Sequence, residues 1–442
     1  MPAAKPVRKA RKSTSELAKG VGVLAVVLIA LLAVLGGWAW YESWQKEKQL
    51  AESYRLRIEG SRATAGAPVP VFAPQQFGSW GAIPPEKQYA AGEIIVADPP
   101  QVFAASIGSL GFTVLDAVRL NNIGTSLQRL RIPVGMSVDE ARRRMAVQYP
   151  GIAVDANHHY QVQQARIGLG DVTAKLPRTL AGWSPGTPRC GAGIRLGLVD
   201  SAVDLSHPAL RGQDVQFRSF NMAGSQAGST DHGTAVAVIM VGKPEWGGLL
   251  PGATLRVGNM FETSVVGDDV GSAVSMLKAV DWLLAEKVQA IDFSVAGADN
   301  KIVRGAIEKI AARNVAIVAP AGNWGTDQYP AYPAAYGDVL AVTAFGDKGL
   351  PYADANIGSY IDFAAPGVDV YTAAPGGGGT LRSGTSFAAP FVAVLAAVDV
   401  AGGRPGNSTS MQAFLSKTII DLGSPGSDPQ FGWGYVAKQP AC

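Results

Sequence analysis

The chain has 442 residues, of which 47% are hydrophobic and 17% are charged. A chain of this length and composition can bury a large core in more than one folded unit, which excludes an intrinsically disordered protein. The formal charge is +3, but residues 1–19 hold six Lys or Arg against one Glu, so the rest of the chain is slightly acidic. This distribution excludes a nucleic-acid-binding domain, and we expect no nucleic-acid partner.

The basic tail at 1–19 precedes a charge-free apolar run of 21 residues from Val21 to Tyr41. About 20 such residues span a bilayer as a helix. We therefore predict a single transmembrane helix at 20–41 in the cell inner membrane. Because positive charges flank its N-terminal side, the N-terminus should be cytoplasmic and the remainder periplasmic or extracellular. A cleaved signal peptide is the alternative, since Gly37 and Ala39 are small enough for a cleavage site.

Residues 42–88 are predicted to form a polar helical extension followed by a linker rich in Pro, Ala and Gly. Between 89 and 160 strand and helix signals follow the order βαββαβ, which is typical of a ferredoxin-like α+β fold. Asp98 is expected to cap the first helix and Ser137 the second. The last strand is expected to be short, at 152–156.

His158 and His159 are predicted to be loop residues rather than metal ligands, because no Cys or further His lies nearby in the chain. We infer no metal and no cofactor. Residues 161–189 have few periodic signals and several Gly and Pro. This segment is therefore predicted to be an exposed connection and a possible autocleavage region.

Three short motifs between 190 and 442 have the residue types that acyl transfer needs. Asp200 ends a buried-strand pattern, His232 opens His-Gly-Thr, and Ser386 lies in Gly-Thr-Ser-Phe-Ala-Ala-Pro. A carboxylate, an imidazole and a hydroxyl are the parts of a nucleophilic triad. Ser386 is expected in the first turn of a buried helix, where amides favour an oxyanion, and Pro390 is expected to be tolerated in that turn.

Each of these residues also has an ordinary structural explanation when taken alone. A Ser at a helix start is usually a cap, a strand-end Asp is usually a turn residue, and a lone His is usually a surface or core residue. His207 is a further candidate base, but it is close to Asp200 in sequence and no Gly-Thr follows it. The order of several motifs therefore decides between these explanations.

The order Asp, His, Ser and the residues around each motif resemble the subtilisin-like serine proteases (subtilase family, peptidase S8). The resemblance implies a three-layer α/β fold with a mostly parallel central sheet. It also implies that Ser386 is the nucleophile, His232 the general base and Asp200 its orienting carboxylate. Asn323, in Ala-Pro-Ala-Gly-Asn, resembles the family's oxyanion donor.

Residues 291–297 resemble the family's substrate-binding strand, which makes Ser294, Val295 and Ala296 substrate-binding residues. Ala296 stands where the family usually has Gly, so its methyl group is expected to narrow the primary side-chain pocket. The unit at 89–160 resembles the family's prodomain, an inhibitor and folding aid. The calcium-binding loop of many relatives is missing after the His232 helix, so we infer no calcium site.

Cys190 and Cys442 are the only cysteines, and they lie at the two ends of the predicted catalytic segment, 190–442. A disulfide between them is expected in an oxidising compartment, and two free thiols are the alternative.

Taken together, these motifs predict a membrane-anchored serine endopeptidase that cuts extracytoplasmic proteins or peptides. We expect it to cut itself between about Tyr160 and Gly170, which would release the catalytic domain from its prodomain and anchor. The alternative is a catalytically silent binding or scaffold protein with this fold. An α/β-hydrolase esterase fits poorly, because its triad order is Ser, Asp, His and its Gly-x-Ser-x-Gly motif is absent.

Overall fold

The computed structural model describes residues 84–162, 167–168, 175–222, 225–263, 269–346 and 349–440. The predicted membrane helix at 20–41 and the predicted disulfide partner Cys442 lie outside these residues. Within them, no helix combines the length and apolarity that a bilayer crossing requires.

The N-terminal part of the described chain is a small antiparallel sheet covered by short helices. Its strand order is β2-β3-β1-β4, and its core includes Ile94, Phe103, Leu130 and Met145. The predicted order of strands and helices is present. Its elements are β1 (Tyr89–Ala97), α2 (Phe103–Ser106), the 3₁₀ helix η3 (Ile107–Leu110), β2 (Thr113–Leu120), β3 (Thr125–Arg131), α3 (Val138–Gln148) and β4 (Ala153–Val162).

One of the two predicted helix caps in this part is wrong. Ser137 accepts a hydrogen bond from the Glu140 N–H and caps α3, as expected. Asp98 is not a cap, because α2 begins only at Phe103. Its carboxylate instead accepts the Ser126 N–H at 2.7 Å and the Thr125 hydroxyl at 3.1 Å. Donors from β3, distant in sequence, have therefore replaced the local helix-capping partners.

Strand β4 is twice as long as expected, since it continues from Ala153 to Val162. The prediction that His158 and His159 lie in a loop is therefore wrong. The extension exists because the last residues of β4 pair with two further strands, β10 and β12, on either side. Pairing with partners more than 100 residues away is not visible in local sequence periodicity.

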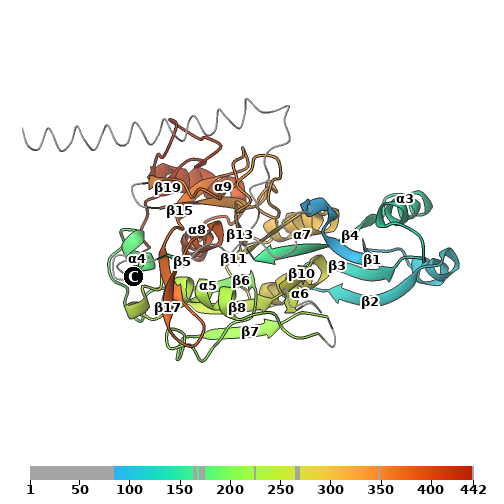
Figure 1. Cartoon of the computed structure of the whole chain (residues 1–442), viewed down its shortest axis with the longest axis horizontal. Helices are drawn as coiled ribbons and strands as arrows, with labels where there is room; N and C mark the ends of the chain where they lie inside the picture. The colour runs from blue at the N-terminus through green and yellow to red at the C-terminus, as the bar shows by residue number, and fades with distance from the viewer. Residues whose placement is uncertain are drawn as a thin grey trace, which may run out of the picture. The chain divides into compact units, whose positions relative to one another are not determined.

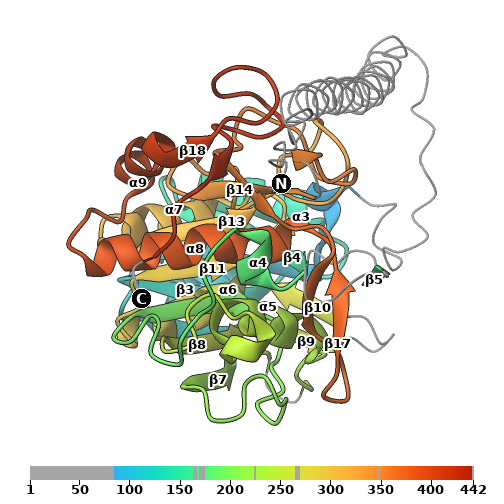
Figure 2. The same cartoon turned by 90° about the vertical axis from the view of Figure 1, so that its left-hand side faces the viewer.

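The larger part of the described chain is built on a parallel sheet. Its strand order is β18-β19-β15-β14-β13-β11-β6-β8-β7, with only β18 running antiparallel to its neighbour. Helices α5 and α8 pack on one face and α6 and α7 on the other (Figures 1 and 2). The sheet strands are β6 (Arg195–Asp200), β7 (Val215–Ser219), β8 (Thr254–Asn259), β11 (Ala290–Phe293), β13 (Ala316–Pro320), β14 (Leu340–Phe345), β15 (Phe363–Pro366), β18 (Ile419–Ile420) and β19 (Tyr435–Val436).

The remaining elements connect or flank this sheet. The helices are α4 (Pro177–Leu180), α5 (Asp231–Val241), α6 (Ala273–Ala285), α7 (Lys301–Ala311), α8 (Thr385–Ala401) and α9 (Ser408–Leu415). The short strands are β5 (Ile167–Gly168), β9 (Phe261–Thr263), β10 (Asp269–Ser272), β12 (Val295–Gly297), β16 (Val370–Ala373) and β17 (Gly379–Arg382). Helix α8 is apolar all round because it crosses the interior, where it packs against β11, β13, β14 and β15.

The segment predicted as an exposed connection is partly buried. Arg178, Ala181 and Trp183 are buried, and the Arg178 guanidinium donates to the carbonyls of Ser184 and Leu249. Ala181 and Trp183 belong to the large core beneath α8. Burial of the large apolar surface of Trp183 contributes more free energy than the local turn preference of the Gly and Pro residues around it. The chain therefore packs against the core here instead of projecting into solvent.

Candidate active site

Asp200 is placed by the end of a parallel strand. It is the last residue of β6, it is fully buried, and the Ser201 N–H donates to its Oδ1 at 2.5 Å. The carboxyl ends of parallel strands form the edge where α/β proteins place their sites. The apolar strand thus delivers a charged group to a buried position beside α5.

His232 connects the other two predicted triad residues. It is the second residue of α5, and its Nδ1 lies 2.9 and 3.0 Å from the two Asp200 oxygens. Its Nε2 lies 2.9 Å from Ser386 Oγ. A carboxylate can only accept, so Nδ1 carries the proton and Nε2 is left to accept from the serine hydroxyl. The structure therefore brings Asp200, His232 and Ser386 together.

Ser386 is the second residue of α8 and is fully buried. Gly384 precedes the helix at φ +151°, a backbone conformation that residues with a Cβ rarely adopt. The expectation that Pro390 lies in the first turn is wrong, since it is the sixth residue of α8. At that place its missing N–H deprives the Ser386 carbonyl of its helical donor.

Asn323 follows β13 and is held by the residue next to the serine. Its Oδ1 accepts the Thr385 N–H at 3.0 Å and the Thr385 hydroxyl at 2.8 Å. The side-chain oxygen is therefore committed to Thr385, and the Nδ2 amide is the donor end of the group. This orientation suits an amide that donates to an oxyanion near Ser386.

The predicted substrate-binding residues belong to, or directly precede, a strand whose edge is already paired with another part of the chain. Val295 and Ala296 belong to β12, and Ser294 directly precedes it. Strand β4 pairs with β12 in antiparallel register, Val162 with Val295, Gln161 with Ala296 and Tyr160 with Gly297. Tyr160 is fully buried there. The effect of the Ala296 methyl group on the side-chain pocket stays a prediction.

Sequence reasoning missed a second buried carboxyl group beside the site. Asp292 of β11 is fully buried, Ser294 Oγ lies 3.4 Å from its Oδ2, and nothing in the described part of the chain hydrogen-bonds its Oδ1. Burial, together with the charge of Asp200, raises the pKa of Asp292 well above its usual value. The sequence feature that indicates such a buried carboxyl group is an Asp between Ile291 and Phe293 in an otherwise apolar strand.

The other histidines are engaged elsewhere. His207 Nε2 lies 2.9 Å from the Gly378 carbonyl and its Nδ1 accepts the Ala209 N–H, so it is not the base. His158 Nδ1 lies 2.9 Å from Asn300 Nδ2. Over the described ranges no cluster of His, Cys, Asp or Glu could hold a metal ion. Cys190 is buried, and its disulfide with Cys442 stays a prediction.

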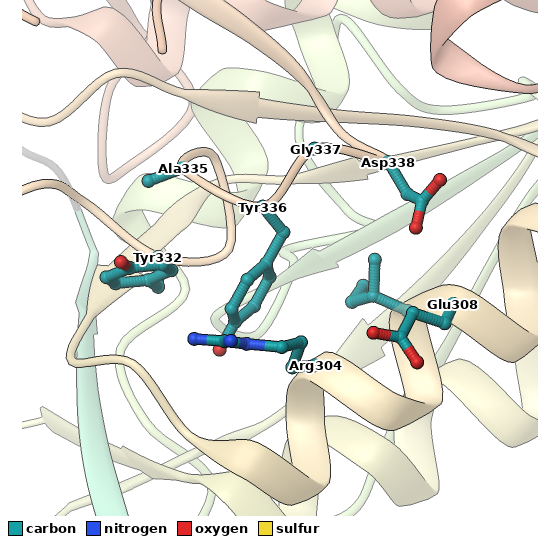
Figure 3. A pocket seen from close by; sticks show the side chains of 8 residues that line it. Arg304, Glu308, Tyr332, Ala335, Tyr336, Gly337 and Asp338 are labelled. Atoms are coloured by element: carbon teal, nitrogen blue, oxygen red, sulfur yellow. The ribbon is translucent and has the colours of Figure 1, made fainter.

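A hollow of about 230 Å³ lies between α7 and the segment that follows Tyr332 (Figure 3). Arg304 lies over the Tyr336 ring and pairs with Asp299, and Glu308 and Asp338 line the same hollow. None of the triad residues lines it. The chemistry of the three predicted motifs therefore belongs to the buried cluster around His232, not to this hollow.

Comparisons with known proteins agree with this assignment. A sequence profile described as "Subtilase family" matches residues 191–434. The chain is 29% identical over 254 residues to the minor extracellular protease Epr of Bacillus subtilis strain 168, covering 56% of this chain and 38% of Epr. It is 25% identical over 252 residues to subtilisin E of the same strain, covering 54% of this chain and 63% of subtilisin E.

A solved structure has a similar fold. It is that of fervidolysin from Fervidobacterium pennivorans, described as a keratinolytic enzyme related to subtilisin. The TM-score is 0.64 at 20% identity, and the match covers 80% of this chain and 61% of fervidolysin. The chain thus spans less than two thirds of the length of each of these three relatives. At this identity the likeness concerns the fold, which is α/β and subtilisin-like with a mostly parallel central sheet.

Proposed function

The chain belongs to the subtilase family, and we propose that it is a serine endopeptidase that hydrolyses internal peptide bonds of extracytoplasmic proteins. The observation that carries this proposal is the position of the His232 ring between Asp200, at 2.9 Å, and Ser386 Oγ, also at 2.9 Å. That arrangement lets one imidazole accept the serine proton while a carboxylate stabilises the resulting cation.

In the proposed mechanism Ser386 Oγ attacks the peptide carbonyl as His232 Nε2 takes its proton. Asp200 keeps the proton on Nδ1 and stabilises the imidazolium. The Ser386 backbone N–H and Asn323 Nδ2 would bind the oxyanion, since Thr385 already occupies the Asn323 oxygen. His232 then protonates the leaving amine, and water repeats the sequence on the acyl-enzyme.

Residues 89–160 are proposed to act as a ferredoxin-like prodomain that inhibits the enzyme. The pairing of β4 with β12 supports this role, because an extended substrate would pair with the same strand. Asp155 adds a second contact, since its Oδ2 accepts the Lys301 N–H at the start of α7. A carboxylate is favourable at a helix N-terminus. The folding-aid role fits the parallel sheet, whose distant strands pair slowly.

Self-processing is proposed to occur between Val162 and Ile167. Val162 pairs with β12 on one side of the site, and Ile167 pairs with Arg382 of β17, only four residues before Ser386. These two pairings flank the interval 163–166 in the chain and involve β12, the proposed substrate strand, and β17, which leads into the serine helix, so we place the scissile bond within this interval. This interval lies within the range of 160–170 predicted from the sequence.

The membrane helix at 20–41 is proposed to hold the protein at the inner membrane until this cut releases the chain after it, including the catalytic domain at 190–442, outside the cytoplasm. Support comes from the sequence and from Epr, which is named as an extracellular protease. Neither the anchor nor Cys442 is part of the described structure. The proposed partners are therefore the protein substrate, the prodomain and the membrane.

Two measurements test the proposal on the wild-type chain and the Ser386→Ala variant. A fluorophosphonate probe should label wild type but not Ser386→Ala or His232→Ala. N-terminal sequencing should find a wild-type product that begins between residues 163 and 167, and only uncut Ser386→Ala. An unlabelled wild type of full length would instead support the silent scaffold protein. Turnover of lipid esters but not of peptides would support an esterase.

A further inference from the structure

An ion pair joins the two segments that carry the nucleophile and the base. Asp231 is the first residue of α5, directly before His232, and Arg382 is the last residue of β17, four residues before Ser386. Arg382 Nη1 donates to Asp231 Oδ2 at 3.0 Å, and Nη2 donates to Oδ1. The contact is thus the two-pronged arrangement in which a planar guanidinium fixes both distance and angle.

The pair is shielded from solvent more than an ordinary surface ion pair. The Arg382 side chain is 6% exposed and that of Asp231 is 25% exposed. Screening by water makes exposed pairs weak, whereas loss of one partner from a shielded pair leaves an uncompensated charge. Asp231 also lies in the first turn of α5, where a carboxylate is favoured by the helix dipole. Shielding therefore strengthens the ion pair, and the helix dipole stabilises the Asp231 carboxylate within it.

A second contact fastens the same two segments one helical turn further on. The Thr372 hydroxyl of β16 donates to the Ala235 carbonyl of α5 at 2.6 Å, and α5 packs against β16. Strands β16 and β17 pair with each other, Val370 with Arg382. The β16–β17 hairpin and α5 are therefore tied at two points, and the chain enters α8 directly from this hairpin.

We propose that Asp231 and Arg382 are positioning residues that set the distance between His232 Nε2 and Ser386 Oγ. This inference rests on the proposed function, and neither residue touches the reacting atoms. Arg382 also pairs through its backbone with Ile167 of β5, which follows the proposed cleavage interval in the chain and would therefore belong to the leaving half. The Asp231–Arg382 ion pair therefore connects β5, the strand that contains Ile167, to the base His232 as well as to the nucleophile Ser386.

The pair also balances the charge next to the base. The ionisable groups on the elements around His232 are Asp200 of β6, Asp231 of α5, Arg382 of β17 and Asp292 of β11, and burial together with the charge of Asp200 raises the pKa of Asp292. Neutralising Asp231 leaves the Arg382 cation near the imidazole, whereas neutralising Arg382 leaves the Asp231 anion. The two substitutions should therefore move the protonation of His232 in opposite directions.

The test compares Asp231→Asn, Arg382→Met, Arg382→Lys and the double variant Asp231→Asn/Arg382→Met, with active sites counted by fluorophosphonate titration. We expect each of the two single neutralising variants to lose about 10–100-fold in kcat per titrated site, with KM changed by less than about threefold. Arg382→Lys should recover part of the rate. The double variant should be no worse than the single variants, because the pair acts as one unit.

The pH profile of kcat/KM separates positioning from a general loss of structure. Its acid limb should move to lower pH in Asp231→Asn and to higher pH in Arg382→Met. Arg256→Met is the matched control, since Arg256 of β8 pairs with Asp214 at 3.0 Å and Glu286 at 3.2 Å away from the triad. It should leave the kcat per titrated site unchanged.

Unchanged kcat per site in Asp231→Asn and Arg382→Met, or additive losses in the double variant, would overturn the positioning role while wild type remained an active protease. A wild type without labelling or turnover would instead contradict the proposed function. If Arg382→Met yields no folded protein, Asp231→Asn, which keeps the shape of the side chain, carries the test.

Discussion

Tyr160 of β4 and Gly297 of β12 lie so close that no side chain fits between them. A Cβ built on Gly297 would come within 2.5 Å of the Tyr160 ring and 2.9 Å of the His159 carbonyl oxygen. The close fit explains how β4 covers β12, the proposed substrate-binding strand, with a fully buried aromatic ring. It also makes Gly297 a sensitive position for testing whether β4 imitates a substrate.

Gly297→Ala should loosen the contact between β4 and β12. Overpacking of a close contact typically costs about 1–3 kcal/mol, so a Ser386→Ala/Gly297→Ala chain should unfold earlier than Ser386→Ala in denaturant. Gly305→Ala is the control, because nothing lies within 4 Å of a Cβ at Gly305 and alanine favours its helix. Equal losses at both glycines would contradict the substrate-like fit of β4.

Asn323→Ala should lower kcat by about 10²–10³ with little change in KM, because an oxyanion donor acts mainly in the transition state. Asn323→Asp should lose at least as much, since a carboxylate of the same shape cannot donate. Thr385→Val removes the hydroxyl that donates to Asn323 Oδ1 and should lose about tenfold. Peptide turnover per titrated site measures all three, and a wild-type rate in Asn323→Ala would refute the assignment.

Acid should weaken the docking of β4 through His159. Burial lowers the pKa of His159 from 6.5 to about 4, with the charge of His158 as a smaller cause. The folded chain therefore binds fewer protons than the unfolded chain, and the contribution to stability is complete above pH 6.5 and lost as the pH falls towards 4. The expected loss is about 1–3 kcal/mol.

Denaturant unfolding of the Ser386→Ala chain between pH 7 and pH 4.5 measures this effect. Replacing His159 with Gln should flatten the slope over that window, because Gln does not titrate. An identical slope in the two chains would show that the acid sensitivity has another origin.

Asp292→Asn should stabilise the protein increasingly as the pH rises. Because the pKa of Asp292 is raised in the folded chain, that state binds more protons, and the wild type loses stability from about pH 4 upwards to the raised value. The stability of Asp292→Asn relative to wild type should therefore grow with pH, which denaturant titrations at pH 4.5, 6 and 8 can measure.

Asp214→Asn provides a control of opposite sign. The hydroxyl of Thr254 lowers the pKa of Asp214, with Arg256 also contributing. Its contribution to stability is therefore present above about pH 4 and lost in acid. A pH-independent difference between Asp292→Asn and wild type would show that the Asp292 carboxyl ionises normally.

The sequence by itself determined the chemistry, because catalytic groups of this kind lie in short contiguous motifs. The order of the short motifs around Asp200, His232 and Ser386 predicts the triad, the resemblance adds Asn323, and the structure brings the first three into hydrogen-bond contact. Ser137 was also predicted correctly, since a helix cap depends on residues three positions apart. The βαββαβ order followed from local periodicity for the same reason.

Only the tertiary structure decided which distant residues meet. The Asp98 carboxylate accepts a hydrogen bond from β3, and β4 extends because it pairs with β10 and β12. Arg382 forms an ion pair with Asp231, which is 151 residues away in the chain. Asp292 became a buried carboxyl next to Asp200 because β6 and β11 are neighbours in the sheet. Register between distant strands depends on packing over the whole core, and no local pattern in the chain encodes it.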